Sequence, residues 1–220
     1  MLGDEPVIYI VDDDFSVRES LQCLLEQAGR RVLVFGSALE FLRYSRPASP
    51  GCLILDLSLP DLNGLELQRR LVRDRTEVPI IFVTGHGDIP TTVQAMKAGA
   101  VEFLTKPFRT DILLSAIEGA IERSRASLEC RADLQALRER HKRLSRRERE
   151  VMDLVVRGQL NKQVGGKLGI SEITVKSHRG RVMRKMQARS LVDLVNMAAR
   201  LSVTAAAIQS LGHSAIAGSV

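Results

Sequence analysis

Five polar residues in the first half of the sequence are candidates for a reactive or metal-binding site. They are the acids Asp12, Asp13 and Asp56, the hydroxyl residue Thr84 and the amine Lys106. Three carboxylates held close together repel one another unless a cation lies among them, so this set implies a hard divalent ion. Mg²⁺ suits the set, because it keeps several waters and takes one or two carboxylates together with phosphate oxygens. The amine and the hydroxyl could bind the remaining oxygens of a phosphoryl group. Such chemistry requires residues far apart in the sequence to meet.

Each of these residues ends or closely follows a short apolar run that has the composition of a buried strand. The expected strands are Val7–Val11, Val32–Phe35, Cys52–Asp56, Pro79–Thr84 and Val101–Leu104. A stretch with helical spacing follows every run, which predicts five strand–helix units and a doubly wound parallel sheet with helices on both faces. In such sheets ligands bind beyond the carboxyl ends of the strands. We therefore expect the five polar residues to converge on one edge of an α/β domain.

Residues 6–120 resemble the receiver domain of bacterial two-component response regulators. The signature stretches occur in the family's order: Val11–Asp14, Leu55–Gly64, Thr84–Gly87, Ala98–Ala100 and Phe103–Phe108. The resemblance implies a domain that accepts a phosphoryl group from a phosphohistidine on a sensor histidine kinase. It also implies that the peptide bond between Lys106 and Pro107 is often cis.

The same resemblance implies a role for each polar residue. Asp56 would accept the phosphoryl group. Asp13, Asp56 and the backbone carbonyl of Ser58 would bind Mg²⁺, or Mn²⁺ in its place. Asp12 would act on the metal ion through water, and Lys106 would pair with a phosphoryl oxygen.

A conformational switch is a further implication of the resemblance. A phosphoryl group adds nearly two negative charges and three acceptor oxygens. The Thr84 hydroxyl would move toward this group, and Phe103 would turn inward into the space that Thr84 leaves, although Phe103 could also be an ordinary core residue. The change would bias a surface made by residues 88–122, the usual dimerisation face of such receivers. We expect a homodimer on phosphorylation.

Two other functions could use the same acids. A phosphatase of the haloacid-dehalogenase type would use Asp56 as nucleophile, but that chemistry needs a second acid two residues later, where this chain has Ser58. The domain could instead be an interaction module that is never phosphorylated. The complete set of acids argues against this alternative. We expect a regulator rather than an enzyme, with at most autophosphorylation from phosphohistidine and autodephosphorylation.

Charge is distributed unevenly along the 220 residues. Residues 1–118 contain 12 basic and 17 acidic side chains and residues 119–220 contain 20 and 9, so a net charge of −5 is followed by one of +11. A strongly basic half indicates a polyanionic partner. No apolar run reaches the roughly 18 residues that a membrane span needs, and the first residues are acidic where a secretory signal would be basic. We expect a cytoplasmic protein without a membrane partner.

A helical linker is expected over residues 121–143. The stretch from Arg109 to Leu144 lacks proline and is rich in Arg, Glu, Ala and Leu, which predicts one long helix or two helices with a break. Its apolar residues form two stripes that are out of phase, one through Ile121 and one through Leu137. We therefore favour a spacer helix, and a short coiled coil stays open as the alternative.

The basic half has the pattern of an all-α domain. The expected helices are one opened by Ser145, then Lys162–Leu168, Glu172–Met186 and Leu191–Leu201. Ser145 begins a capping box, while Asn161 and Ser171 are the expected caps of the next two helices. In the third helix, Ile173, Val175, Val182 and Met186 are expected to face the core, Val175 only partly. A short helix, a glycine turn and a basic helix make a helix-turn-helix.

Residues 144–201 resemble the LuxR/FixJ-type DNA-binding domain. The matching stretches are Leu144–Val151, Gly158–Val164, Leu168–Ser171, Thr174–Lys176, His178 and Lys185–Met186. The family would place several residues of the third helix near bases: Thr174, Lys176, Ser177, Arg179 and Gly180. It would place Arg181 and Lys185 near phosphates.

Two departures from the family pattern affect this domain. Gly165 and Gly166 stand where alanine is commoner, and each should weaken the second helix by about 1 kcal/mol relative to alanine. Gly180 stands where some members have a base-contacting lysine, so a base preference cannot be transferred.

With the receiver, these features indicate a transcriptional regulator of the FixJ subgroup. The expected divisions are residues 1–120, 121–143, 144–201 and a low-complexity tail, 202–220. The implied partners are a sensor histidine kinase, double-stranded promoter DNA and a second copy of the chain, with RNA polymerase as a further candidate.

Overall fold

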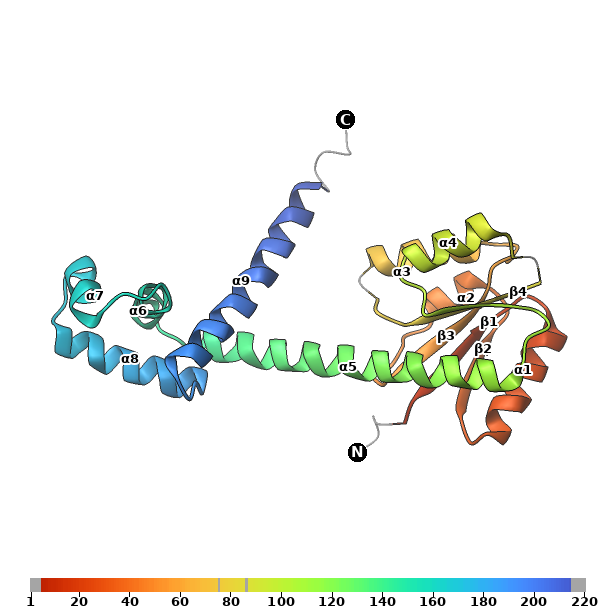
Figure 1. Ribbon diagram of the computed structural model, residues 1–220, viewed down its shortest axis with the longest axis horizontal. Helices are drawn as coiled ribbons and strands as arrows, with labels where there is room; N and C mark the ends of the chain where they lie inside the picture. Colours follow the sequence, from red (N-terminus) through yellow and green to blue (C-terminus); the bar gives the residue numbers. More distant parts are fainter. Residues whose placement is uncertain (1–4, 75, 86, 215–220) are drawn as a thin grey trace. The chain divides into compact units, whose positions relative to one another are not determined.

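The computed structural model describes residues 5–74, 76–85 and 87–214, with side chains described as far as residue 202 (Figure 1). The chain divides into two compact units, Met1–Cys130 and Arg131–Val220, and each is described by itself. Among the described residues, no helix is long and apolar enough to cross a membrane.

A five-stranded sheet forms the centre of the first unit. Its strands are all parallel and lie in the order β2-β1-β3-β4-β5. They are β1 (Val7–Val11), β2 (Arg31–Phe35), β3 (Gly51–Asp56), β4 (Ile80–Thr84) and β5 (Glu102–Thr105). The predicted α/β fold is confirmed, and no strand limit moves by more than one residue from its prediction.

Helices cover both faces of this sheet (Figure 1). They are α1 (Phe15–Gln27), α2 (Ala38–Arg43), α3 (Gly64–Arg73), α4 (Ile89–Lys97) and α5 (Thr110–Lys142). On one face α2, α3 and α4 bury Phe41, Leu67 and Ala95 against the strands. On the other face α1 and α5 bury Leu25 and Ile117. The sheet therefore has two separate apolar cores.

The alternation of side chains in β1 explains how one strand serves both cores. Val7, Tyr9 and Val11 point to the face covered by α2, α3 and α4, while Ile8 and Ile10 point to the opposite face. Successive side chains of a strand point to opposite faces, so a strand covered on both sides must be apolar throughout. Polar residues are thereby confined to the strand ends.

The register of the strands brings those polar ends together. Val11 pairs with Leu55, so Asp12 and Asp56 leave neighbouring strands at the same level. Thr84 at the end of β4 pairs with Thr105, one residue before Lys106. Helical crossovers return every strand in the same direction, and the carboxyl ends of β1, β3, β4 and β5 therefore lie along one edge.

Four helices follow in the second unit: α6 (Arg146–Val156), α7 (Asn161–Leu168), α8 (Glu172–Met186) and α9 (Leu191–Ser214). The predicted capping box is present, since Ser145 Oγ accepts from the Glu148 amide at 3.3 Å and Glu148 Oε2 accepts from the Ser145 amide at 2.7 Å. Ser171 caps α8 as predicted, and its Oγ accepts from the Thr174 amide at 3.1 Å.

Two small apolar clusters hold this unit together. One joins α6, α7 and α8 through Val151, Val155, Val164 and Val175. The other contains Leu137, Leu144, Met152, Val182, Met186 and Leu194. The last turns of α5 therefore belong to the second unit, and α5 is one unbroken helix from Thr110 to Lys142.

Three sequence predictions for this unit were wrong. Asn161 is the first residue of α7 rather than its cap, and the Gln163 side chain instead accepts from the Leu160 amide. Ile173, expected in the core, is 82% exposed, because it lies two residues before the buried Val175 and therefore on the opposite side of α8. α9 ends at Ser214 rather than at Leu201, so the tail expected to be partly helical or disordered is helical as far as Ser214. No proline interrupts it, and the alanines at 205–207 favour a helix; residues 215–220 lie outside the described residues.

The two adjacent glycines of α7 have different surroundings. A Cβ added to Gly165 would lie 2.7 Å from the backbone oxygen of Ile170, whereas one added to Gly166 would meet nothing within 4 Å. The chain must turn sharply here, and Gly169 adopts a φ of 66° at the end of the helix. Gly165 is therefore required by close packing, and Gly166 is not.

We predict that Gly166→Ala raises the free energy of unfolding of the full chain by about 0.5–1 kcal/mol, because alanine is the better helix former. Gly165→Ala should bring no such gain, since its methyl group would displace the turn before α8. Urea unfolding followed by circular dichroism compares the two variants. An equal gain in both would contradict the packing argument.

Candidate functional sites

The carboxyl edge of the sheet holds an ammonium between two buried carboxylates. Lys106 Nζ lies 2.7 Å from Asp12 Oδ2 and 3.4 Å from Asp56 Oδ1. Asp12 is 3% exposed and Asp56 is 6% exposed. Buried charges are tolerated only when they are paired and hydrogen-bonded, so these three residues depend on one another.

Backbone amides satisfy the other oxygens of both acids. Asp12 Oδ1 accepts from the Asp14 amide at 2.9 Å, and Asp56 Oδ2 accepts from the Ser58 amide at 2.9 Å. Each carboxylate thus orients the turn that follows its own strand. The two turns carry the other residues that were expected to bind a metal.

Burial and these contacts shift the pKa values of Asp56 and Lys106. Burial raises the pKa of the Asp56 carboxyl above its usual value, and the charge of Lys106 and the Ser58 amide offset this only in part. Burial would lower the pKa of Lys106, but the hydrogen bond and charge of Asp12, joined by Asp56, raise it overall. The lysine therefore stays charged, and Asp56 is the acid that is harder to ionise than an ordinary one.

Thr84 and Phe103, the two residues expected to form the switch, lie near this edge. Thr84 is buried, and its backbone oxygen accepts from the Lys106 amide at 2.7 Å. The Phe103 ring is half-buried, with its centroid 6.0 Å from that of Phe82. A Cβ on Gly87 would approach Phe103 Cε1 to 2.9 Å, so the ring lies against the turn after β4. The peptide bond between Lys106 and Pro107 is cis, as the resemblance implied.

Asp13, which follows Asp12 directly, has an exposed side chain. No cluster of three carboxylate, imidazole or thiol groups able to hold a metal occurs in the part of the chain that the structure describes. The donors still suit Mg²⁺, because this ion needs only one or two carboxylates and takes its other ligands from water, phosphate or backbone carbonyls. Asp56 and the neighbouring Ser58 carbonyl belong to that class of donor.

In the second unit, α8 carries the residues that were expected to contact DNA. Most of them are exposed: Lys176, Ser177, Gly180, Arg181 and Lys185. Thr174 and Arg179 are half-buried, and Arg179 Nη1 donates to Asn161 Oδ1 at 3.3 Å. The α7–α8 pair thus has the arrangement of a helix-turn-helix, with a basic surface on its second helix.

Lys185 also forms bonds within its own domain that the sequence did not indicate. Its Nζ lies 2.7 Å from Glu148 Oε2 and 3.1 Å from the backbone oxygen of Arg143. Burial alone would raise the pKa of Glu148, but the bonds from Lys185 and the Ser145 amide outweigh it and lower the pKa. Lys185 therefore stabilises the start of α6, and a phosphate contact by this residue stays a prediction.

Two known domain families match the chain. Residues 8–118 match the response regulator receiver domain, and residues 142–198 match the bacterial regulatory proteins of the luxR family. The chain is a two-component response regulator with a LuxR-type DNA-binding domain. It is therefore a regulator of transcription, as the FixJ-subgroup resemblance implied.

Whole-length relatives support this assignment. The regulator is 49% identical to nodulation protein W of Bradyrhizobium diazoefficiens over 90% of its own length and 88% of that protein. It is 42% identical to the transcriptional regulatory protein FixJ of the same organism over 88% and 94% of the two chains. The structure of the response regulator StyR superposes with a TM-score of 0.79, at 45% identity, over 89% and 99% of the two chains.

Sequence reasoning missed one cation beside the acidic edge of the regulator. Arg18 Nη1 donates to the backbone oxygen of Asp12 at 2.6 Å, and its guanidinium lies 5.7 Å from the centroid of the Phe15 ring. The contact fixes the turn that carries Asp12 and Asp13. Nothing in the local sequence marks Arg18, because the contact exists only once α1 folds back toward the end of β1.

We predict that Asp56→Asn is more stable than the wild-type regulator at neutral pH. Folding raises the pKa of Asp56, so the folded protein binds a proton more tightly there and loses stability as the pH rises through the raised pKa. The neutral amide removes this loss, and the difference should shrink as the solution is acidified below the usual aspartate range. Urea unfolding at a series of pH values measures it, with the exposed-residue variant Asp111→Asn as control. A variant less stable than the wild type at neutral pH would contradict the sign.

Lys185→Met should lower the free energy of unfolding by about 2 kcal/mol, because it leaves the Glu148 carboxylate buried without its cation. The matched control is Arg184→Met, which removes a neighbouring exposed charge from the same helix and should have little effect. Thermal and urea unfolding of the full chain compare the stabilities of the two variants. If both substitutions cost the same, the ion pair does not stabilise the fold.

Proposed function

We propose that a sensor histidine kinase transfers a phosphoryl group to Asp56 and that this transfer controls DNA binding by the regulator. A carboxylate oxygen of Asp56 attacks the phosphorus, the phosphorus–nitrogen bond of the phosphohistidine breaks, and an acyl phosphate forms on Asp56. The observation that carries the proposal is the Lys106 ammonium, held 3.4 Å from Asp56 at the carboxyl edge of the sheet. A fixed cation there favours the oxygens of an arriving phosphoryl group.

Asp13, Asp56 and the backbone carbonyl of Ser58 would hold Mg²⁺, or Mn²⁺ in its place, with Asp12 acting through water. When bound, the ion neutralises charge on the phosphoryl oxygens. The remaining roles belong to side chains of the regulator itself. Asp12 keeps Lys106 in position through its 2.7 Å contact, and Lys106 pairs with a phosphoryl oxygen once the group is on Asp56.

A switch at Thr84 and Phe103 would report this event. The Thr84 hydroxyl turns toward the phosphoryl group, and the Phe103 ring moves into the space that it leaves. Two observations favour this pair: Lys106 is hydrogen-bonded through its amide to Thr84, and Phe103 packs beside Gly87 in the turn that follows Thr84. A change at the acidic edge would therefore reach the start of α4 through contacts within one turn.

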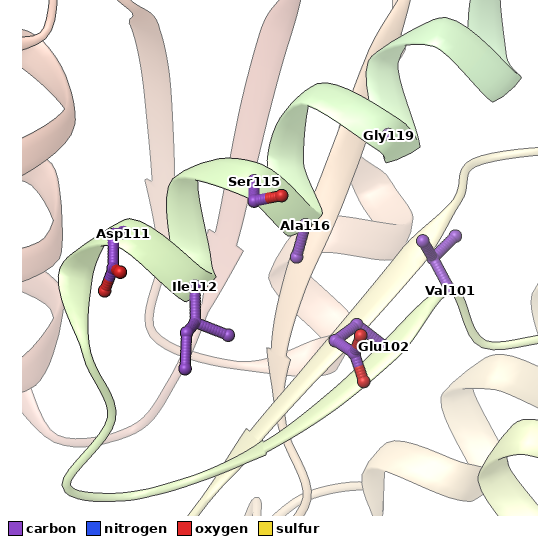
Figure 2. Close-up of a pocket in the computed structure, with 7 residues that line it drawn as sticks. All are labelled: Val101, Glu102, Asp111, Ile112, Ser115, Ala116 and Gly119. Atoms are coloured by element: carbon purple, nitrogen blue, oxygen red, sulfur yellow. The ribbon is translucent and has the colours of Figure 1, made fainter.

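The surface that responds would be formed by α4, β5 and the start of α5, and it would bind a second copy of the regulator. Figure 2 shows the residues that line a pocket between β5 and α5: Val101, Glu102, Asp111, Ile112, Ser115, Ala116 and Gly119. Ile112 is 44% exposed, and α4 of the same unit leaves Ile89, Val93 and Met96 exposed. Exposed apolar side chains gathered on one face are typical of an interaction surface.

Dimerisation would place two copies of α8 on a two-fold-related promoter site, with half-sites about one helical turn apart. Thr174, Lys176, Ser177, Arg179 and Gly180 would lie at base edges. Arg181 and Lys185 would contact phosphates, and RNA polymerase is a further candidate partner. The net charge of +11 in residues 119–220 supports binding to a polyanion.

The test is to phosphorylate the full chain with a small acyl phosphate and Mg²⁺ and to follow three properties. We expect one added phosphoryl group by mass spectrometry, a doubled molecular weight by light scattering, and about tenfold stronger enrichment of specific genomic DNA fragments. Asp56→Asn should show none of these changes, and Asp74→Asn, at an exposed acid outside the proposed dimerisation surface, should behave as the wild type.

Two results would overturn the proposal in different ways. A phosphorylated regulator whose molecular weight and DNA enrichment are unchanged would remove the switch. An Asp56→Asn variant that is as active in cells as the wild type would instead favour a receiver that acts as an interaction module without phosphorylation.

A further inference from the structure

An acid outside the predicted site links the turn after β3 to a different helix. Asp61 Oδ2 accepts from the Leu39 amide at 2.9 Å, and Asp61 Oδ1 accepts from the Ala38 amide at 3.4 Å. These amides belong to the first turn of α2, which is 22 to 23 residues away in the sequence. The link therefore joins two parts of the receiver that no local pattern connects.

The first turn of α2 leaves amides without a partner inside the helix, as every helix does. Ser37 Oγ accepts from one of them, the Glu40 amide, at 3.2 Å. Asp61 accepts from the other two, so its carboxylate completes the cap that Ser37 begins. Negative charge is also favourable at the N-terminus of a helix.

α2 is a firm support for this contact. Ala38 and Phe41 are fully buried in the core. The Phe41 ring packs edge-on against Tyr9 and Phe35, with centroids 5.6 and 5.4 Å apart. An element held by such contacts can fix the position of a turn bonded to it.

The turn in question runs from Leu57 to Asn63 and contains Ser58, whose carbonyl is the proposed metal ligand. Its start is tied to Asp56 through the Ser58 amide at 2.9 Å. Its two ends are tied to each other, because the Gly64 amide donates to Leu57 O at 3.0 Å. Asp61 ties its middle to α2, so the segment that carries the Ser58 carbonyl is held at three points.

We propose that Asp61 is a positioning residue for the metal site: by tying the turn after β3 to the first turn of α2, it holds the Ser58 carbonyl and the Asp56 carboxylate where a divalent ion needs them. The inference rests on the proposed function, because it takes Asp56 and Ser58 as the ligands. Residues behind the metal ligands orient them, and removing such a residue weakens metal binding without removing a ligand.

The test is a titration of the full chain with Mn²⁺, in which electron paramagnetic resonance measures the free ion. Asp61→Ala should raise the Kd about tenfold. The Mg²⁺ concentration that half-saturates phosphorylation by an acyl phosphate should rise by the same factor, while the rate at saturating Mg²⁺ should stay at the wild-type value. Asp61→Asn keeps one acceptor oxygen, so its Kd should lie between those of the wild type and Asp61→Ala.

Ser37→Ala is the matched control, because it removes a cap from the same turn of α2 but leaves the link to the turn after β3. We expect it to lower thermal stability as Asp61→Ala does and to leave the Kd for Mn²⁺ unchanged. A Kd that is unchanged in Asp61→Ala, or raised equally in Ser37→Ala, would overturn the inference alone. A wild-type chain that takes up neither metal nor phosphoryl group would overturn the proposed function and this inference with it.

Discussion

The Lys106 ammonium lies between the carboxylates of Asp12 and Asp56, and all three groups are largely removed from water. The ammonium makes two buried carboxylates acceptable there, although burial still disfavours the charged form of Asp56. Keeping them together requires β1, β3 and β5 to end at the same level, and it requires the turns after β1 and β3 to direct their amides at the acids. The same grouping leaves Asp56 next to a fixed cation, which is the condition that the proposed phosphoryl transfer needs.

A similar constraint organises the DNA-binding unit. Its apolar core is divided into two small clusters, and Glu148 at the start of α6 forms an ion pair with Lys185 near the end of α8. The recognition helix is therefore held by an ion pair as well as by apolar contacts. A lysine that the family pattern places at a phosphate has a structural bond within the domain, so DNA phosphates and Glu148 would compete for the same ammonium.

Most of the fold could be predicted because it depends on local patterns. The five apolar runs mark the strands, of which β1, β3 and β4 are buried on both faces. Ser145 and Ser171 mark helix starts through bonds that span three residues. The failures have equally local causes. Ile173 was assigned to the core by its type, yet it lies on the side of α8 opposite to the buried Val175. Asn161 is the first residue of α7, and the Gln163 side chain accepts from the Leu160 amide instead. The glycine pair in α7 looked like a single weakness, whereas the packing of Ile170 makes only Gly165 necessary.

The sequence by itself determined which residues stand at the strand ends, the alternation that buries the sheet, the basic character of α8 and the family to which the regulator belongs. Only the tertiary structure decided which partner each charge takes: Arg18 with the Asp12 carbonyl, Asp61 with the first turn of α2, and Lys185 with Glu148. The reason is physical. Strand and helix patterns repeat every two to four residues and are visible locally, but an ion pair or a cap between distant residues exists only after strand order and helix packing have brought its two groups within hydrogen-bonding distance.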